Sequence, residues 1–256
     1  MPEKKKIVVI FSGGLDSTTL IYYLLDKGYE VLPLSFNYSQ KHNIELKKAK
    51  ITCDKLGLIY KEIDMRFMKD LLGDSTALTS DGVEVPTLQD VLGEAQPITY
   101  VPNRNMLMLS VALSYAEANE ANNICFGAQS HDEYSGYWDT TMRFVESING
   151  VSTLNREHQI KTIAPFVYLN KAEEIVLGQF LNIPYEDTWT SYRVVDEIKE
   201  IADSTNPTSR DRIMAFARVG VKDPQKYEIE LNWDELFSKY KQEYDIEEIK
   251  NKIQDV

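Results

Sequence analysis

The chain has 256 residues, of which 43% are hydrophobic and 27% charged, which is typical of one large soluble domain with or without a small appendage. Its net charge of −12 disfavours non-specific binding to nucleic acid and favours a small-molecule or protein partner. No apolar run approaches the roughly 20 residues that span a membrane. No signal-peptide cleavage pattern is present, and the two cysteines are expected to be reduced. We therefore expect a cytoplasmic protein with no membrane partner.

The first part of the chain alternates short apolar runs with stretches whose apolar residues recur at helical spacing. Strands are predicted at 6–11, 30–36 and 58–63, and helices at 17–27 and 44–56. Strands that alternate with helices in this way form a parallel sheet with helices on both faces.

Residues 64–98 interrupt this alternation. A short helix is predicted at 67–72, and the polar segment 74–96 has a length typical of a lid over an active face. The alternation then resumes, with helices predicted at 106–117, 140–152 and 171–179 and strands at 124–128 and 161–165. The predicted fold class is therefore α/β, a doubly wound, Rossmann-like sheet of five parallel strands.

The last part of the chain has a looser pattern. We expect a helix at 194–202, a proline-bearing loop at 204–209, a helix at 211–219, and one or two amphipathic helices within 233–256 that dock on the domain or on another subunit. The expected organisation is a nucleotide-binding domain over 1–187 and a helical region over 188–256 packed on it.

The segment from Ser12 to Thr18 is the strongest functional signal. It follows a buried strand and opens a helix, where unpaired backbone N–H groups and the helix dipole favour a bound anion. Gly13 and Gly14 allow close approach, and the hydroxyls of Ser12, Ser17 and Thr18 add donors around Leu15. Asp16 would repel phosphates unless Mg²⁺ bridges them, so the segment predicts an ATP site with Mg²⁺; a capped glycine turn without a ligand is the alternative.

Two further loops follow predicted strands or precede helices at the same edge of the sheet. Phe36, Asn37, Tyr38 and Gln40 are expected to contact adenine or ribose, with an ordinary surface turn as the alternative. Arg104 opens an apolar helix and is expected to clamp a developing anion; the alternative is a surface arginine.

A glycine-bearing aromatic loop follows the predicted fourth strand and suits a flat heterocycle. Gly127 permits close approach of the nucleotide, and we expect the substrate to contact Asp132, Tyr134, Tyr137, Asp139 and Arg143. Lys171 lies near a helix start, where the helix dipole disfavours a cation, so it is expected to bind an anion such as a phosphate; a solvated surface lysine is the alternative. Asp16, Arg104 and Lys171 are the predicted catalytic residues.

In this order, these segments resemble the 7-cyano-7-deazaguanine synthase family of queuosine biosynthesis, within the PP-loop ATP pyrophosphatase superfamily. The matching strings are SGGLDSTT (12–19), FNYSQKH (36–42), YVPNRN (100–105), GAQSHDEYSGYWD (127–139), IKTIAPF with NKAEEI (160–175), TWTSYR (188–193) and RIMAFARVGVKDP (212–224).

The resemblance implies an ATP-dependent C–N ligase that adenylates 7-carboxy-7-deazaguanine and releases pyrophosphate. Ammonia then displaces AMP to form an amide, and a second ATP-driven step forms the nitrile. The implied cofactors are ATP and Mg²⁺, and the implied assembly is a homodimer.

The chain departs from the family at its zinc site. The family carries four zinc cysteines, whereas the corresponding positions here hold Ser191, Asp203, Asn206 and Ser209. Serine and amide side chains are weak zinc ligands, so we expect no structural zinc. Packing is expected to hold this region instead, through Ile198, Ile201, Ile213 and Phe216, and the nitrile-forming step is left open.

Three other functions stay open at this point. A repurposed, defence-associated relative would transfer the activated deazaguanine to a protein amine, and a binding module would hold ATP without turnover. A tRNA thiolation enzyme is a further alternative, which the acidic surface disfavours.

Overall fold

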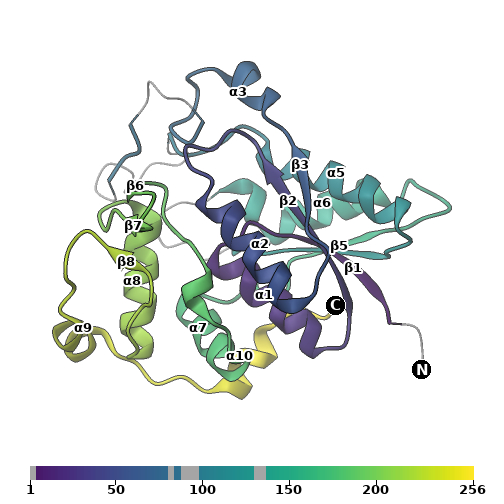
Figure 1. The fold of residues 1–256 in the computed structure, drawn as a ribbon. Helices are drawn as coiled ribbons and strands as arrows, with labels where there is room; N and C mark the ends of the chain where they lie inside the picture. Colours follow the sequence, from purple (N-terminus) through teal and green to yellow (C-terminus); the bar gives the residue numbers. More distant parts are fainter. Residues whose placement is uncertain (1–3, 80–83, 88–97, 130–136) are drawn as a thin grey trace.

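The computed structural model describes residues 4–79, 84–87, 98–129 and 137–256. Its main sheet has the order β3-β2-β1-β4-β5, and every neighbouring pair is parallel. The strands are β1 (Lys6–Ile10), β2 (Glu30–Asn37), β3 (Lys61–Asp64), β4 (Asn123–Phe126) and β5 (Lys161–Ile163). The predicted five-stranded parallel α/β fold is confirmed (Figure 1).

Helices cover both faces of this sheet (Figure 1). In the first half they are α1 (Leu15–Asp26), α2 (Ile44–Leu56), the short α3 (Phe67–Leu72) and α5 (Arg104–Ala118). After β4 come the 3₁₀ turn η1 (Trp138–Thr140), α6 (Met142–Ser152) and, after β5, α7 (Lys171–Phe180), then the 3₁₀ turn η2 (Tyr185–Asp187).

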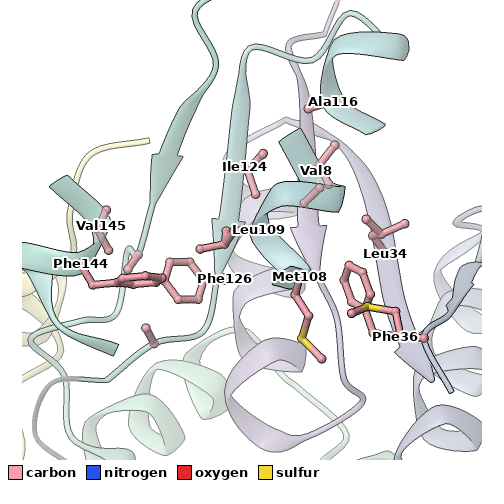
Figure 2. Close-up of a cluster of buried hydrophobic side chains, with 14 of the residues drawn as sticks. Val8, Leu34, Phe36, Met108, Leu109, Ala116, Ile124, Phe126, Phe144 and Val145 are labelled. Carbon is pink, nitrogen blue, oxygen red and sulfur yellow. The ribbon is translucent and has the colours of Figure 1, made fainter. Parts of the chain in front are cut away.

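The side chains of successive residues of β1 point to opposite faces of the sheet, as strand geometry requires. Val8 belongs to a core with Leu109 of α5 and Val145 of α6, and Figure 2 shows these side chains beside those of β2 and β4. Ile7 and Val9 belong to a second core on the other face, with apolar residues of α1, α2 and α7. Full burial of each such side chain contributes about 1.5–3 kcal/mol, so the central strand is anchored from both sides.

The order of the strands reverses at β1, which pairs with β2 on one side and β4 on the other. Helix α1, which connects β1 to β2, packs on one face of the sheet, and α5, which precedes β4, packs on the other, so a crevice opens beyond the carboxyl ends of β1 and β4. The segment Ser12–Gly14 and Gly127 both lie at that point, directly after the two strands.

The helix predicted at 194–202 is wrong. This segment contains β6 (Val194–Asp196) and β7 (Ile201–Ala202), which form a small sheet with β8 (Lys226–Tyr227). Asp196 Oδ1 accepts hydrogen bonds from the backbone N–H groups of Ile198 and Lys199, both 3.0 Å long, and so forms the turn between strands. Ile198, expected to pack, is 95% exposed at this turn, because a turn residue faces solvent.

The loop predicted at 204–209 is wrong in its second half, because α8 (Pro207–Val219) begins four residues earlier than expected. Proline suits the first turn of a helix, where its missing N–H would have no partner, and Asn206 caps this one by accepting from Ser209 N at 3.2 Å. Ile213 and Phe216 are buried as expected, whereas Ile201 is half-buried.

The chain ends in two short helices, α9 (Trp233–Tyr240) and α10 (Ile246–Lys252). The second brings Ile249 into the core beside α1 and α7. None of the described helices is long and apolar enough to cross a membrane. The division of the chain into a nucleotide-binding domain over 1–187 and a helical region over 188–256 stays a prediction.

Candidate functional site

The segment between β1 and α1 forms a tight turn that α2 covers. Gly13 has φ +84°, and a Cβ there would lie 2.1 Å from the Glu45 carbonyl oxygen, so only glycine fits. Ser12 Oγ lies 3.0 Å from Ser17 Oγ and accepts a hydrogen bond of 3.2 Å from Gly14 N. The N-cap of α1 is Gly14, which has no side chain, and Leu15 N makes only a long hydrogen bond of 3.4 Å to Thr190 Oγ1. The helix start is therefore open to an external anion.

A cavity of about 300 Å³ opens beside this turn. Many residues predicted from the sequence line it: Ser12, Gly14, Asp16, Ser17, Phe36, Tyr38, Gln40, Arg104, Gly127, Tyr137 and Lys171. The fold therefore brings the segments after β1, β2 and β4 and the starts of α5 and α7 to one place. Its volume is at the lower end of the range for small-molecule sites.

Lys171 forms ion pairs with two carboxylates at the edge of the cavity. Its Nζ lies 2.7 Å from Asp16 Oδ1 and 3.5 Å from Asp211 Oδ2. Burial is the largest influence on the pKa of Asp16 and raises it, but the Lys171 ammonium and the smaller effects of Glu174 and Arg212 together outweigh burial, so this pKa is lowered. Burial likewise disfavours the Lys171 charge, yet Asp16 and Asp211 raise its pKa. Both groups are thus ionised at neutral pH.

Glu174 lies behind this ion pair and is fully buried. Burial and then the charge on Asp16 raise its pKa well above the ordinary range. Both effects favour the uncharged form of Glu174 beside the charged Asp16.

Arg104 faces the cavity from the start of α5. Its Nη1 donates a weak hydrogen bond of 3.4 Å to Tyr38 Oη, and the guanidinium carbon lies 5.7 Å from the Tyr38 ring centroid. Burial disfavours its charge, but Tyr38, Tyr192 and Asp139 raise its pKa, so it stays a cation. Asp139 is itself buried and does not line the cavity.

Several predicted residues lie outside the cavity lining. The turn after β1 contains Gly13, and the buried residues Leu15 and Thr18 of α1 follow it. The Asn37 amide donates a hydrogen bond of 3.2 Å to Glu62 Oε1. Arg143 is exposed on α6. Asp132 and Tyr134 lie outside the described residues.

Sequence reasoning missed other residues that line the cavity, among them Glu45, Gln129, Trp189, Thr190, Tyr192 and Asp211. Glu45 lies in the first turn of α2, and Asp211 in α8. Glu45 could have been found from the sequence, because it follows the segment 36–42 that was predicted to contact the nucleotide. Nothing in the local pattern around Asp211 indicated proximity to Asp16, because almost 200 residues separate them.

The four positions aligned with zinc cysteines do come together, as a hydrogen-bonded cluster. Asn206 Nδ2 lies at its centre and donates to Ser191 Oγ at 2.9 Å, Ser209 Oγ at 3.0 Å and the Asp203 carbonyl at 2.8 Å. Asp203 Oδ2 pairs with Arg193 Nη1 at 3.2 Å. An N–H donor cannot bind a cation, and no three described His, Cys, Asp or Glu residues form a metal cluster. These residues do not fit zinc.

Comparison with known proteins identifies relatives along most of the chain. Residues 6–220 match the family described as queuosine biosynthesis protein QueC. A 7-cyano-7-deazaguanine synthase of Caldicellulosiruptor saccharolyticus is 40% identical over 90% of this chain and 99% of its own length. The synthase of Clostridium kluyveri is 41% identical over 87% and 98%, respectively. The synthase of Thermoplasma volcanium is 36% identical over 92% and 95%.

The family match extends from β1 to α8 and includes every segment that lines the cavity. The chain therefore belongs to the QueC family of queuosine biosynthesis proteins.

Proposed function

We propose that this protein is an ATP-dependent ligase that adenylates 7-carboxy-7-deazaguanine and converts the carboxylate with ammonia to the amide and then the nitrile. The observation that carries this proposal is the single cavity in which an open helix start, two cations and several aromatic faces meet. The names of the relatives, whose full lengths the chain covers almost completely, point to the same reaction.

Activation of a carboxylate requires a good leaving group on its carbon. In the proposed reaction a substrate oxygen attacks the α-phosphorus of ATP, the bond to the bridging oxygen breaks, and pyrophosphate leaves. The start of α1 and the hydroxyls of Ser12 and Ser17 would hold the phosphates, and Arg104 and Lys171 would stabilise negative charge that develops on them. Preorganised donors of this kind lower the barrier because they need no reorganisation.

Asp16 fits the role of a magnesium ligand. Its side chain is 28% exposed toward the cavity and its lowered pKa keeps it a hard oxygen donor, and Mg²⁺ binds through one or two carboxylates together with substrate phosphates. The ion, when bound, would offset the negative charge of the phosphates.

The deazapurine would lie against the aromatic part of the lining. Tyr137 faces the cavity, its hydroxyl shares a 2.8 Å hydrogen bond with Thr99 Oγ1, and its ring stacks on Tyr100 with centroids 6.1 Å apart. A ring held in this way offers a fixed apolar face to a flat heterocycle. The homodimer and the cytoplasmic location remain predictions.

The test is mass spectrometry of the purified protein incubated with ATP, Mg²⁺, 7-carboxy-7-deazaguanine and ammonium. A nitrile product with two AMP per turnover is expected. Amide with one AMP would limit the proposal to its first step, and acyl-adenylate alone would direct the search to another amine acceptor. Absence of AMP would contradict the proposal.

A further inference from the structure

The reaction proposed above releases a proton from nitrogen, and this proton needs an acceptor. When the lone pair of ammonia attacks the acyl carbon, a C–N bond forms and nitrogen takes a positive charge. The C–O bond to the AMP phosphate then breaks and its electron pair leaves with AMP. One N–H proton must be lost to give the neutral amide, and a positioned base speeds such transfers by about 10²–10⁴-fold.

Three described carboxylates line the cavity: Asp16, Glu45 and Asp211. Asp16 and Asp211 both pair with Lys171, at 2.7 Å and 3.5 Å from its Nζ, so both already have a cationic partner. No hydrogen bond or ion pair joins the Glu45 carboxylate to another described residue. Within the described part of the chain, Glu45 is thus the cavity carboxylate that no ion pair holds, although the charge of Arg104, which lines the same cavity, acts on it.

The backbone fixes Glu45 next to the turn Ser12–Gly14 between β1 and α1. Its carbonyl oxygen lies where a Cβ on Gly13 would fall, so the first turn of α2 rests directly on this segment. The side chain is half-buried and faces the cavity shared by Arg104 and Asp16. A base at this place lies in the cavity where the proposed function puts the reaction, next to the turn between β1 and α1.

We propose that the Glu45 carboxylate is the proton acceptor for the nitrogen nucleophile that attacks the acyl-adenylate. This inference rests on the proposed function and assigns the proton step within it. Glu45 Oε takes the proton from the attacking nitrogen as AMP departs and then releases it to water.

The surroundings of Glu45 suit this role. Burial raises its pKa to about 7, the Arg104 cation on α5 opposes that rise, and the Asp16 anion on α1 adds to it. Tyr38, which follows β2, is buried and lines the same cavity; burial raises its pKa, Arg104 opposes the rise and the Glu45 charge adds to it. A base whose pKa lies near the working pH is both available and strong enough to accept a proton.

The test separates the two half-reactions in wild type, Glu45→Gln and the control Asp54→Asn, whose exposed carboxylate lies on α2 outside the cavity. Exchange of pyrophosphate into ATP, driven by 7-carboxy-7-deazaguanine without amine, reports adenylation. Its absence in wild type would contradict the proposed function itself. Glu45→Gln is expected to keep this exchange within about threefold and to lose amide formation from ammonia by about 10²-fold or more.

Hydroxylamine supplies the second readout. Its nitrogen becomes far more acidic than that of ammonia after attack, so it loses its proton to water without a base. Glu45→Gln is therefore expected to form the hydroxamate within about tenfold of wild type, and Glu45→Asp to recover part of the amide activity. At constant free ammonia, the wild-type rate should rise as the pH rises through about 7, and this rise should vanish in Glu45→Gln.

Three results would overturn the inference. Amide formation at the wild-type rate in Glu45→Gln would show that the proton goes elsewhere. Equal loss of exchange and amide formation would place Glu45 in adenylation or in folding. Equal loss of amide and hydroxamate, with exchange intact, would assign Glu45 to binding of the nucleophile.

Discussion

Lys171 Nζ donates a 2.7 Å hydrogen bond to Asp16 Oδ1 and so joins the start of α7 to the start of α1 beside the cavity. The lysine side chain is 9% exposed, and Asp211 on α8 approaches the same ammonium. One cation therefore pairs with two carboxylates from elements far apart in the chain, at the place where the triphosphate of ATP is proposed to lie.

Lys171→Met should remove both charge stabilisation and an anchor of the site. We expect adenylation, measured as pyrophosphate exchange, to fall by about 10²–10³-fold. Stability in urea should fall by up to about 3 kcal/mol, because Asp16 and Asp211 lose their cation. Lys50→Met, an exposed lysine of α2, is the matched control. Exchange within twofold of wild type would contradict a role of Lys171 in the site.

Arg104→Ala should lower turnover without unfolding the protein, because its protein contacts are weak. The hydrogen bond to Tyr38 is 3.4 Å long, so little stability depends on it. We expect a fall in kcat/KM of about 10²-fold or more and a change in Tm within about 3 °C. Arg104→Lys, which keeps the charge but not the planar fork, should recover part of the activity. Unchanged turnover would exclude the proposed clamp.

Arg212 and Asp223 form an ion pair in which both side chains are fully buried, with Nε to Oδ2 at 2.8 Å and Nη2 to Oδ1 at 2.9 Å. Arg212→Met leaves the Asp223 charge buried without its partner, so urea unfolding should show a loss of about 3–5 kcal/mol. The double variant with Asp223→Leu should lose less than the sum of the single variants. Additive losses would mean that the two side chains do not depend on each other.

The Asn206 cluster should hold the C-terminal region without metal. Treatment with a strong zinc chelator is expected to leave the Tm of the wild-type protein unchanged. Asn206→Ala removes the cap of α8 and the donor to Ser191 and Ser209, so we expect a loss of about 1–2 kcal/mol in urea unfolding. Asn232→Ala, which removes the exposed cap of α9, is the control for a cap alone. A chelator-dependent fall in Tm would contradict the expectation of no zinc.

Glu45 should make stability depend on pH. Its pKa is about 7 in the folded protein against an ordinary value of 4.5, so the folded state binds the proton more tightly. Its contribution to stability therefore improves as the pH falls from about 7 toward 4.5 and is least favourable above 7. Glu45→Gln should raise Tm at pH 8, and the gain should shrink toward pH 5; Asp54→Asn should show no such trend. An equal change at both pH values would contradict burial of this carboxyl.

Local chemistry made a large part of the fold predictable from the sequence. The helix predicted at 44–56 has those bounds in the structure, and the strands β1 and β2 differ from prediction by one residue at an end. These elements carry strong periodicity and are bounded by glycine or polar residues. The small sheet of β6, β7 and β8 could not be predicted in this way, because strands of two or three residues are defined by their partners rather than by their own pattern.

The sequence by itself determined the parallel α/β fold, the glycine turn after β1 and membership of the family, because buried strands, a glycine turn and a helix start are local features. Only the tertiary structure decided that Lys171 pairs with Asp16 and Asp211, that Glu45 lines the same cavity as Arg104, and that Asn206 joins Ser191 to Ser209. Each of these depends on crossovers that bring together residues tens to hundreds of positions apart, and no local pattern records such proximity.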